Sequence, residues 1–458
     1  MSNQSVSKSL HEPGQPAMRE GMVTVLLGLS IVLVIMNTMM FNLALPDVAS
    51  AFDLTASSAS WIVTGYSIVF AISSITYSRL SDFVPIRRLF IIGLLSLGIA
   101  AIGGFFSGSF VPLLIARILQ ASGAGSIPAL SLVLVTRYVP LERRGKAMAT
   151  IMSAASLGLG LGPVAGGVIV QYLGWHYLFA VTAATLLLIP FYARLLPKER
   201  PASGSFDAVG ALFAGIGTTG LLLFLTNQSW MALAAGLAAV ALFVLRIWLA
   251  ADPFVQPGLF RNRPFLTLGA VGIVAYLCSF ATLFLMPQIL VHRFGLSASQ
   301  SGLVIFPGSI LAMIVSRWVG KIIDKHGNRA IIRYVPLLLL VSVILFALLA
   351  TTSYWAILFI YMLLSVGFTF LSSSISNEMS RILPAAQIGS GLGLFQLLQF
   401  FSGAFGVAVT ASALVWQRKL PLSAAYGNIY WGMGIIVLVS IGCAQLYRRY
   451  AQRSMPAS

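Results

Sequence analysis

Fourteen long apolar segments constrain this 458-residue chain more than any other feature of its sequence. Each is about twenty residues long, the length that an α-helix needs to cross the hydrocarbon core of a bilayer. Inside lipid every backbone N–H and C=O must be paired, and continuous apolar runs achieve this as helices. We therefore predict an all-α integral membrane protein. The predicted spans are 22–45, 57–76, 89–107, 110–134, 146–171, 175–196, 207–226, 230–250, 265–290, 302–323, 331–351, 353–376, 388–416 and 428–448.

Composition excludes several other classes of protein. With 58% hydrophobic and 9% charged residues, the chain differs from soluble domains, which are about a quarter charged. Residues 1–21 are polar, so we expect no cleavable signal peptide before the first span. Cys278 and Cys443 lie in separate spans, and we expect neither a disulfide framework nor a metal site. No nucleotide-binding loop or Ser–His–Asp set is present, so we expect no cofactor and no enzyme activity.

The basic residues indicate how the chain lies in the membrane. A net charge of +17 at first suggests a nucleic-acid partner. With the N-terminus inside, however, nearly all Lys and Arg residues fall in cytoplasmic segments or at cytoplasmic span ends. This bias predicts a cell-membrane protein with both termini in the cytoplasm. Attraction to anionic membrane lipid explains the basic excess without nucleic acid. The exceptions are Arg117 and Arg317 within spans, and Arg293, Arg418 and Lys419 outside.

None of the eleven Asp and Glu residues lies in the middle of a span. Proton-driven transporters usually keep a titratable carboxylate at membrane depth, so the absence directs attention to Arg117. A permanent cation inside span four normally faces the bundle interior with a polar partner. Candidate partners are Asn37 and Asn42 on span one, or Asp47 at its outer end. Gln120, which follows Arg117 in span four, is a further candidate for proton coupling or the substrate cavity. The alternative is that Arg117 reaches the outer interface by snorkelling.

A short signature occurs twice. The chain reads Ser-Arg-Leu-Ser-Asp82, followed by Arg87 and Arg88, and later Gly-Lys-Ile-Ile-Asp324, followed by Arg329. Both copies are predicted on short cytoplasmic loops, eight spans apart. This offset predicts two pseudo-symmetric six-helix bundles that flank two extra central helices, a design suited to alternating access. The predicted parts are a tail at 1–21, a first bundle at 22–196, a linker with the two extra helices at 197–264, a second bundle at 265–448 and a tail at 449–458.

The duplicated loops are candidate gates. An Asp at a helix end, close to guanidinium groups, can tie two helices and the N-terminus of a third together. Such a clasp would stabilise one of two transporter states. The alternative is that these charges merely face water, since exposed ion pairs contribute little. The candidate gating residues are Asp82, Arg87, Arg88, Asp324 and Arg329.

Two further spans carry candidate functional residues. Small residues four apart in span five allow a neighbouring helix to approach closely, and a proline there permits a kink. This segment is either a hinge and seal between the halves or simply a tight packing surface. Gln396 and Gln399 in span thirteen could bind a substrate or a neighbouring helix. The residues of the span-five segment are Gly158, Gly160, Gly162, Pro163, Gly166 and Gly167.

These segments together resemble the major facilitator superfamily, specifically its fourteen-span drug:proton antiporter branch. The resemblance covers nearly the whole chain, and its motifs look closest to the K and L class tetracycline exporters of Gram-positive bacteria. It implies the major facilitator fold, a coupling role for Arg117, a gating role for Asp82 and an antiporter motif in span five. The matching segments are 43–47, 61–66, 78–87, 116–124, 162–167, 252–259 and 305–308.

The sequence also departs from that pattern. Ser78 and Pro85 stand where the loop motif has glycine. The tetracycline exporters carry acids in spans one, five and thirteen, and the aligned positions here are Asn37, Leu159 and Gly403. Their proton-binding and metal-tetracycline-binding roles therefore do not transfer to these three residues.

We accordingly expect an exporter of lipophilic, drug-like small molecules that acts as a functional monomer in membrane lipid, with protons as the coupling ion. One alternative is an exporter of an endogenous metabolite, peptide or siderophore on the same fold. Another is a non-transporting membrane sensor or assembly factor on a degenerate transporter scaffold. The duplicated loops and the glycine segment favour transport, whereas the missing carboxylates leave the coupling site open.

Overall fold

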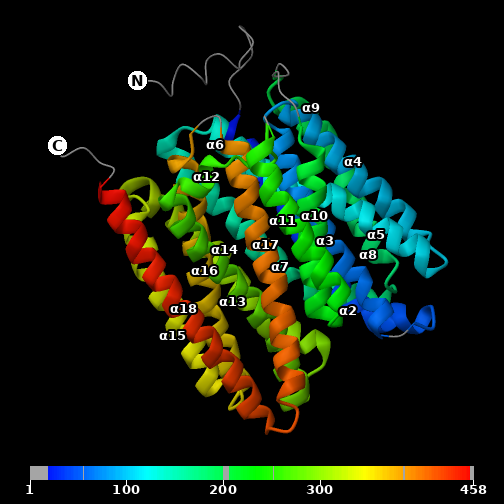
Figure 1. Ribbon diagram of the computed structural model, residues 1–458. Helices are drawn as coiled ribbons and strands as arrows, with labels where there is room; N and C mark the ends of the chain where they lie inside the picture. The colour runs from blue at the N-terminus through cyan, green and yellow to red at the C-terminus, as the bar shows by residue number, and fades with distance from the viewer. Residues whose placement is uncertain (1–18, 55, 200–205, 251, 385–386, 454–458) are drawn as a thin grey trace.

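The computed structural model describes residues 19–54, 56–199, 206–250, 252–384 and 387–453. Within these ranges every regular element is a helix (Figure 1). Thirteen helices are long and apolar enough to cross a membrane, and Ala208–Phe224 forms a shorter apolar helix. The prediction of an all-α, polytopic fold is confirmed. Each of the fourteen predicted spans lies mostly within one helix or within consecutive helices.

The helices of the first half run from α2 to α9, and two more helices follow them. The first-half elements are α2 (Glu20–Ala51), α3 (Ala56–Leu80), α4 (Ile86–Phe105), α5 (Phe110–Ala124), α6 (Ser126–Tyr138), α7 (Leu141–Tyr172), α8 (Tyr177–Ala183), the 3₁₀ turn η1 (Ala184–Leu188) and α9 (Ile189–Leu195). The added pair is α10 (Ala208–Asn227) and α11 (Trp230–Leu249).

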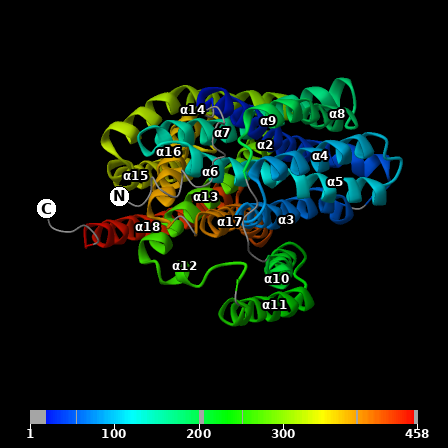
Figure 2. The same cartoon turned by 90° about the horizontal axis from the view of Figure 1, so that it is seen from above.

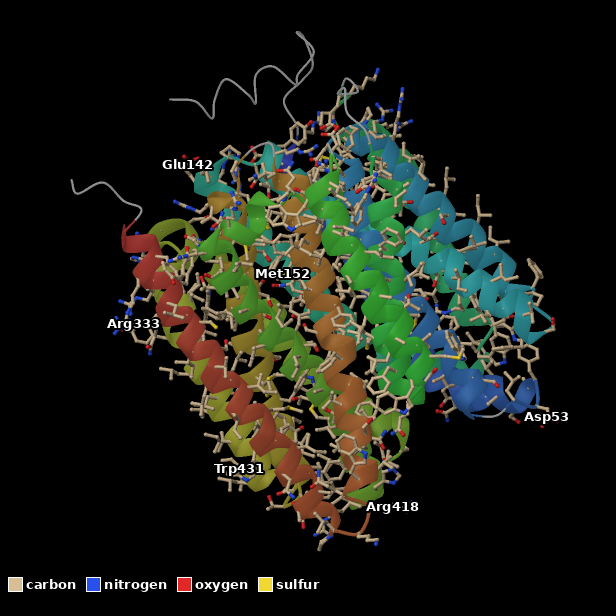
Figure 3. All side chains as sticks on the ribbon, viewed as in Figure 1. Asp53, Glu142, Met152, Arg333, Arg418 and Trp431 are labelled. Carbon is tan, nitrogen blue, oxygen red and sulfur yellow. The ribbon has the colours of Figure 1, made fainter. Side chains whose placement is uncertain are left out.

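The second half begins with a short helix, and its long helices then follow. These elements are α12 (Gly258–Arg261), α13 (Arg263–Phe294), α14 (Ala298–His326), α15 (Arg329–Leu349), α16 (Tyr354–Ile382), α17 (Ile388–Trp416) and α18 (Leu422–Arg453). We call the end of the bundle where α2 begins and α18 ends the terminal face. Figure 3 shows Glu142 at this face, and Asp53 and Arg418 at the opposite end.

Two predicted spans are divided rather than continuous. The span at 110–134 consists of α5 and α6, which meet at Gly125. A Cβ at Gly125 would lie 2.6 Å from the carbonyl oxygen of Phe70, so this close crossing requires glycine. Pro128 also removes one backbone donor from the first turn of α6. In the span at 175–196, α8 and α9 are separated by η1, and Pro190 opens α9.

The two halves meet along two seams, α3 with α17 and α7 with α14. Three glycines of α7 lie against α2, where a Cβ at Gly162 would be 2.4 Å from Cβ of Met39. Gly160 instead meets Ser309 of α14 in the other half. The helix runs unbroken through Pro163, and Gly167 is half-buried. Close packing therefore joins α7 both to its own half and to the opposite half.

The added helices form a hairpin beside one seam. A Cβ on Gly220 of α10 would lie 2.6 Å from Cα of Gly236 on α11. The Asp207 carboxylate caps α10 through Gly210 N and accepts hydrogen bonds from Arg246 Nε and Phe254 N, both at 3.2 Å. α10 contacts both α3 and α17. Figure 2 shows the hairpin outside this pair, away from α7 and α14.

Candidate functional site

Arg117 lies in α5 and is fully buried inside the first half. Its Nη1 donates to Oε1 of Gln120 at 3.0 Å, and its Nε donates to the carbonyl oxygen of Ile62 at 3.4 Å. The guanidinium carbon lies 3.8 Å from the ring centroid of Phe41 and 4.0 Å from that of Tyr66. Arg117 therefore remains inside the bundle and does not snorkel.

Aromatic rings, rather than a carboxylate, surround this cation. Among the described side chains, no carboxylate lies within ion-pair distance of Arg117. A cation–π contact contributes about 1 to 2 kcal/mol, increasing as it is desolvated, whereas a charge at the centre of a membrane helix costs about 3 kcal/mol on insertion scales. Two such contacts and two hydrogen bonds are thus enough to hold the charge. Among the described residues, Nη2 of Arg117 and Nε2 of Gln120 have no hydrogen-bond partner.

The structure separates the candidate partners of Arg117. Asn37 reaches Arg117 only indirectly, through Tyr66. Its Nδ2 donates to Oη of Tyr66 at 3.2 Å, and its Oδ1 accepts from Thr182 at 2.8 Å. Asp47 is exposed near the end of α2 and forms no ion pair with Arg117. Asn42 lies in α2, but its side chain is outside the described part of the structure. Among the described side chains, none of the predicted partners contacts Arg117 directly. Gln120 was predicted only as a site residue, and the sequence did not identify Phe41 and Tyr66 as partners of Arg117.

Asp82 lies at the terminal face, in the turn between α3 and α4. Its Oδ1 accepts from Nη2 of Arg137 at 2.9 Å and its Oδ2 accepts from Nη1 of Arg79 at 2.8 Å. The backbone N–H of Gly389, in the first turn of α17, also donates to this carboxylate. Ser78 Oγ donates to the carbonyl oxygen of Gly389 at 2.7 Å. A loop of the first half is thereby attached to the N-terminus of a helix of the second half.

Asp324 makes the reciprocal attachment. Its Oδ2 accepts from the backbone N–H of Lys146 at 3.1 Å, and Gly145 N also donates to it. Both amides belong to the first two turns of α7 in the first half. A Cβ at Gly320 would lie 2.6 Å from Cα of Lys146. Because each half supplies one Asp to the backbone of the other, we call these contacts the reciprocal clasps.

Two details of the predicted gates need correction. Asp324 was expected on a loop, but α14 continues past it to His326 and ends before Gly327, whose φ of +76° favours glycine. Arg87 and Arg88 lie in the first turn of α4, and Arg329 begins α15. The cations paired with Asp82 are instead Arg79 and Arg137. Arg137 is 55 residues away in sequence, and nothing in the repeated signature points to it.

Burial governs the acidity of the Asp82 carboxyl. Loss of water raises its pKa above the usual value, although Arg137 and Arg79 act in the opposite direction.

Two buried carboxylates at the terminal face were missed as site residues. Glu199 accepts hydrogen bonds from Tyr138 Oη and from Ile86 N, the first residue of α4. Glu378 on α16 accepts from Tyr447 Oη and Asn328 Nδ2, the latter just before α15, both at 2.5 Å. Glu199 thus joins the segment after α9 to the ends of α4 and α6, and Glu378 joins α16 to α18 and to the start of α15. In the first half the Glu follows α9 and the Tyr ends α6, whereas in the second half the Glu is on α16 and the Tyr is on α18. The two pairs therefore occupy opposite positions in the two halves and do not appear as a sequence repeat.

Replacing Asp82 with asparagine should slow transport about tenfold, the effect of losing roughly 1.4 kcal/mol of charge-assisted bonding. Asparagine keeps the shape but removes the charge that pairs with Arg79 and Arg137. Substrate affinity should change less than about twofold, because the clasp acts on exchange between states. Initial transport rates and equilibrium binding measured on the same preparation check this.

The exposed Asp53 provides the matched control. Asp53→Asn should leave both quantities unchanged, since this residue lies at the end opposite the clasps (Figure 3). A tenfold loss of affinity in Asp82→Asn with an unaltered rate would contradict the gating interpretation.

Aromatic side chains from both halves meet near the middle of the helices. Phe70 of α3 and Phe400 of α17 have ring centroids 4.7 Å apart. Tyr276 of α13 lies 5.9 Å from Phe400 and 5.0 Å from Phe368 of α16. We call Phe70, Phe400, Tyr276 and Phe368 the midplane aromatic cluster. Gln396 and Gln399, both predicted as candidates, lie on the same part of α17 and are 2% and 1% exposed.

Comparisons with known proteins bear on the overall fold and on the family of the chain. The family model described as Major Facilitator Superfamily matches residues 27–407. The riboflavin transporter RibZ of Clostridioides difficile is 26% identical over 430 residues, covering 90% of this chain and 94% of that protein. The lincomycin resistance protein LmrB of Listeria monocytogenes is 24% identical, covering 84% of each chain. The crystal structure of the human organic anion transporter MFSD10 (TETRAN) superposes with a TM-score of 0.70 at 19% identity, covering 94% of this chain and 100% of that one.

Proposed function

The chain belongs to the Major Facilitator Superfamily, and from this premise we propose that it is a secondary active exporter of lipophilic, drug-like compounds. The proposed cycle alternates access between the two membrane sides in exchange for protons. The observation that carries the proposal is the pair of reciprocal clasps, because each joins the two halves only at the terminal face. Contacts of this kind can break and reform as the halves rock against each other.

The orientation follows from charge. The terminal face carries most of the Lys and Arg residues, which favours its placement in the cytoplasm. The clasps then close the cytoplasmic side, and the structure corresponds to a state in which the cytoplasmic route to the solute site is shut. In this assignment Asp82 and Asp324 stabilise that state, and their release opens the cytoplasmic route for the next solute.

A related candidate function is export of an endogenous metabolite. The similarity to a riboflavin transporter over 94% of that protein's length favours this alternative, whereas the similarity to a lincomycin resistance protein favours drug efflux. Both functions use the same fold and the same clasps. The intact clasps also weigh against a non-transporting sensor, because such a protein would not require a contact that opens and closes.

Proton coupling has a direct test in proteoliposomes. A pH gradient of one unit supplies about 1.4 kcal/mol per proton and so supports about tenfold accumulation of solute. We expect this accumulation to disappear when nigericin collapses the pH gradient. Lincomycin and riboflavin as separate solutes distinguish the two candidate functions.

Valinomycin in potassium, which removes only the membrane potential, serves as the control and should leave part of the accumulation intact. Undiminished accumulation after nigericin would show that another gradient drives the protein.

A further inference from the structure

The position of two glutamines on α17 points to the interior of the molecule. At 100° per residue, Gln396 lies on the face directly opposite Phe405, which is 37% exposed. Gly393 and Phe400 face α3, since Gly393 lies against Ser78 and Phe400 contacts Phe70. Phe395, Gly403 and Gly406 face α13. Gln396 falls between these two faces, where α3, α13 and α17 meet.

Each of these glutamines keeps a hydrogen-bonding atom without a partner. Oε1 of Gln396 and Nε2 of Gln399 are buried and unpaired in the described structure. Gln399 lies towards α13, because its Nε2 would be 3.5 Å from a Cβ built on Gly272. A buried unpaired amide group is costly unless something else satisfies it. One turn of α17 therefore offers one free acceptor and one free donor.

Flat apolar surface lies beside this pair. Phe400 directly follows Gln399, and its ring contacts Phe70 and Tyr276. Phe400 is about 18 Å along α17 from its first residue, close to the centre of that helix. Tyr276 and Phe70 are likewise near the middle of α13 and α3. Solute sites in transporters of this design lie at the bilayer midplane, between the two halves.

We propose that Gln396 and Gln399, with Phe70, Phe400 and Tyr276, bind an uncharged planar nitrogen heterocycle whose edge presents a ring N–H beside a carbonyl. The glutamine acceptor takes the N–H, and the glutamine donor reaches the carbonyl. The aromatic side chains stack on the ring. This inference rests on the proposed transport function and names the solute class for it.

The proposed site disfavours charged solutes. The described side chains of the site include neither an acid nor a base, and a buried charge without a partner is strongly disfavoured. The buried cation Arg117 is separated from Phe400 by the rings of Tyr66 and Phe70, whose centroids are 6.0 Å apart. Because Phe70 and Phe400 belong to opposite halves and are in contact here, the heterocycle enters by separating these rings.

Lumichrome is a suitable probe because it is flat, uncharged and fluorescent, with an N–H between two carbonyl groups. Its 1,3-dimethyl derivative keeps the ring system but lacks both ring N–H groups. Fluorescence titration of the purified full-length protein should show about tenfold weaker binding of the methylated compound, the effect of one lost hydrogen bond that leaves a buried acceptor unpaired. Gln396→Leu and Gln399→Leu should each weaken lumichrome about tenfold, and Gln396→Leu should also abolish discrimination against the methylated compound.

Gln417→Leu is the matched control, because this glutamine ends the same helix and bonds to Asn428 at 2.8 Å. It should bind both compounds as the unmodified protein does. Thermal unfolding provides a second readout. Replacing an unpaired buried amide with leucine should not lower the stability of the protein, whereas replacing a glutamine that served only to join helices should lower it. Equal binding of the two compounds, full discrimination in Gln396→Leu, or no binding of lumichrome would overturn the proposal.

Transport measured in parallel separates this proposal from the broader one. Selective lumichrome binding without accumulation of any solute would refute the exporter while leaving the site in place. Proton-driven accumulation of lincomycin with no selectivity for the imide edge would refute the site alone.

Discussion

Transport should fall about a hundredfold when Arg117 is replaced by glutamine, while insertion into the membrane is retained. The side chain is fully buried and contacts Phe41 and Tyr66 as well as Gln120. Loss of two desolvated cation–π contacts removes about 3 kcal/mol, and a barrier change of that size corresponds to about a hundredfold in rate. Initial efflux rates in proteoliposomes, normalised to the amount of inserted protein, measure the effect.

Two further variants test whether the loss of transport is specific to the guanidinium group of Arg117. Arg117→Lys should stay strongly impaired, because a compact ammonium cannot replace a planar guanidinium across two aromatic rings. Arg418→Gln removes an exposed cation at the far end of the bundle (Figure 3) and should transport normally. Full activity of Arg117→Gln would exclude a role for this cation in the cycle. Full activity of Arg117→Lys alone would show that charge matters and ring contact does not.

Gly162→Ala should destabilise the protein by about 1 to 3 kcal/mol, the usual cost of overpacking a tight contact. The added methyl would lie 2.4 Å from Cβ of Met39 and 3.1 Å from the carbonyl oxygen of Met36 on α2. Relieving this clash moves α2 away from α7, which also lies on the seam with α14. Thermal unfolding in detergent should show a lower midpoint, and transport should be reduced together with it.

Gly103→Ala is the control for this substitution. Gly103 is also inside a long helix, α4, but nothing lies within 4 Å of the added Cβ. Alanine in place of helical glycine otherwise stabilises by about 1 kcal/mol, so this variant should unfold at the same temperature or higher. Equal behaviour of the two variants would show that α7 and α2 do not depend on close approach at Gly162.

Hydrophobicity and spacing were sufficient to predict the helical membrane fold. The apolar runs predicted the positions of the helices, and the span at 388–416 coincides with α17. The repeated Asp signature led to Asp82 and Asp324, and the cost of burying a cation led to Arg117. The fold prediction is confirmed because a run of apolar residues limits the structure directly, whereas the functional roles of Asp82, Asp324 and Arg117 stay predictions.

Partners distant in sequence could not be predicted in the same way. Arg137 reaches Asp82 from the end of α6, and Phe41 reaches Arg117 from α2, and neither carries a local signal. Phe400 was not selected because an apolar aromatic in a membrane helix is usually part of the core or faces lipid. Its contact with Phe70 depends on how the two halves pack, which the spacing of residues does not determine.

The α10–α11 hairpin makes the two sides of the transporter unequal for molecules dissolved in the membrane. On one flank α10 lies against α3 and α17, whereas on the other flank the hairpin leaves α7 and α14 uncovered (Figure 2). A hydrophobic solute that diffuses within a leaflet therefore meets one seam open to lateral access and one that is shielded. Cleavage of the 250–264 connection would test whether the shield must stay attached, since Asp207 joins it to Phe254.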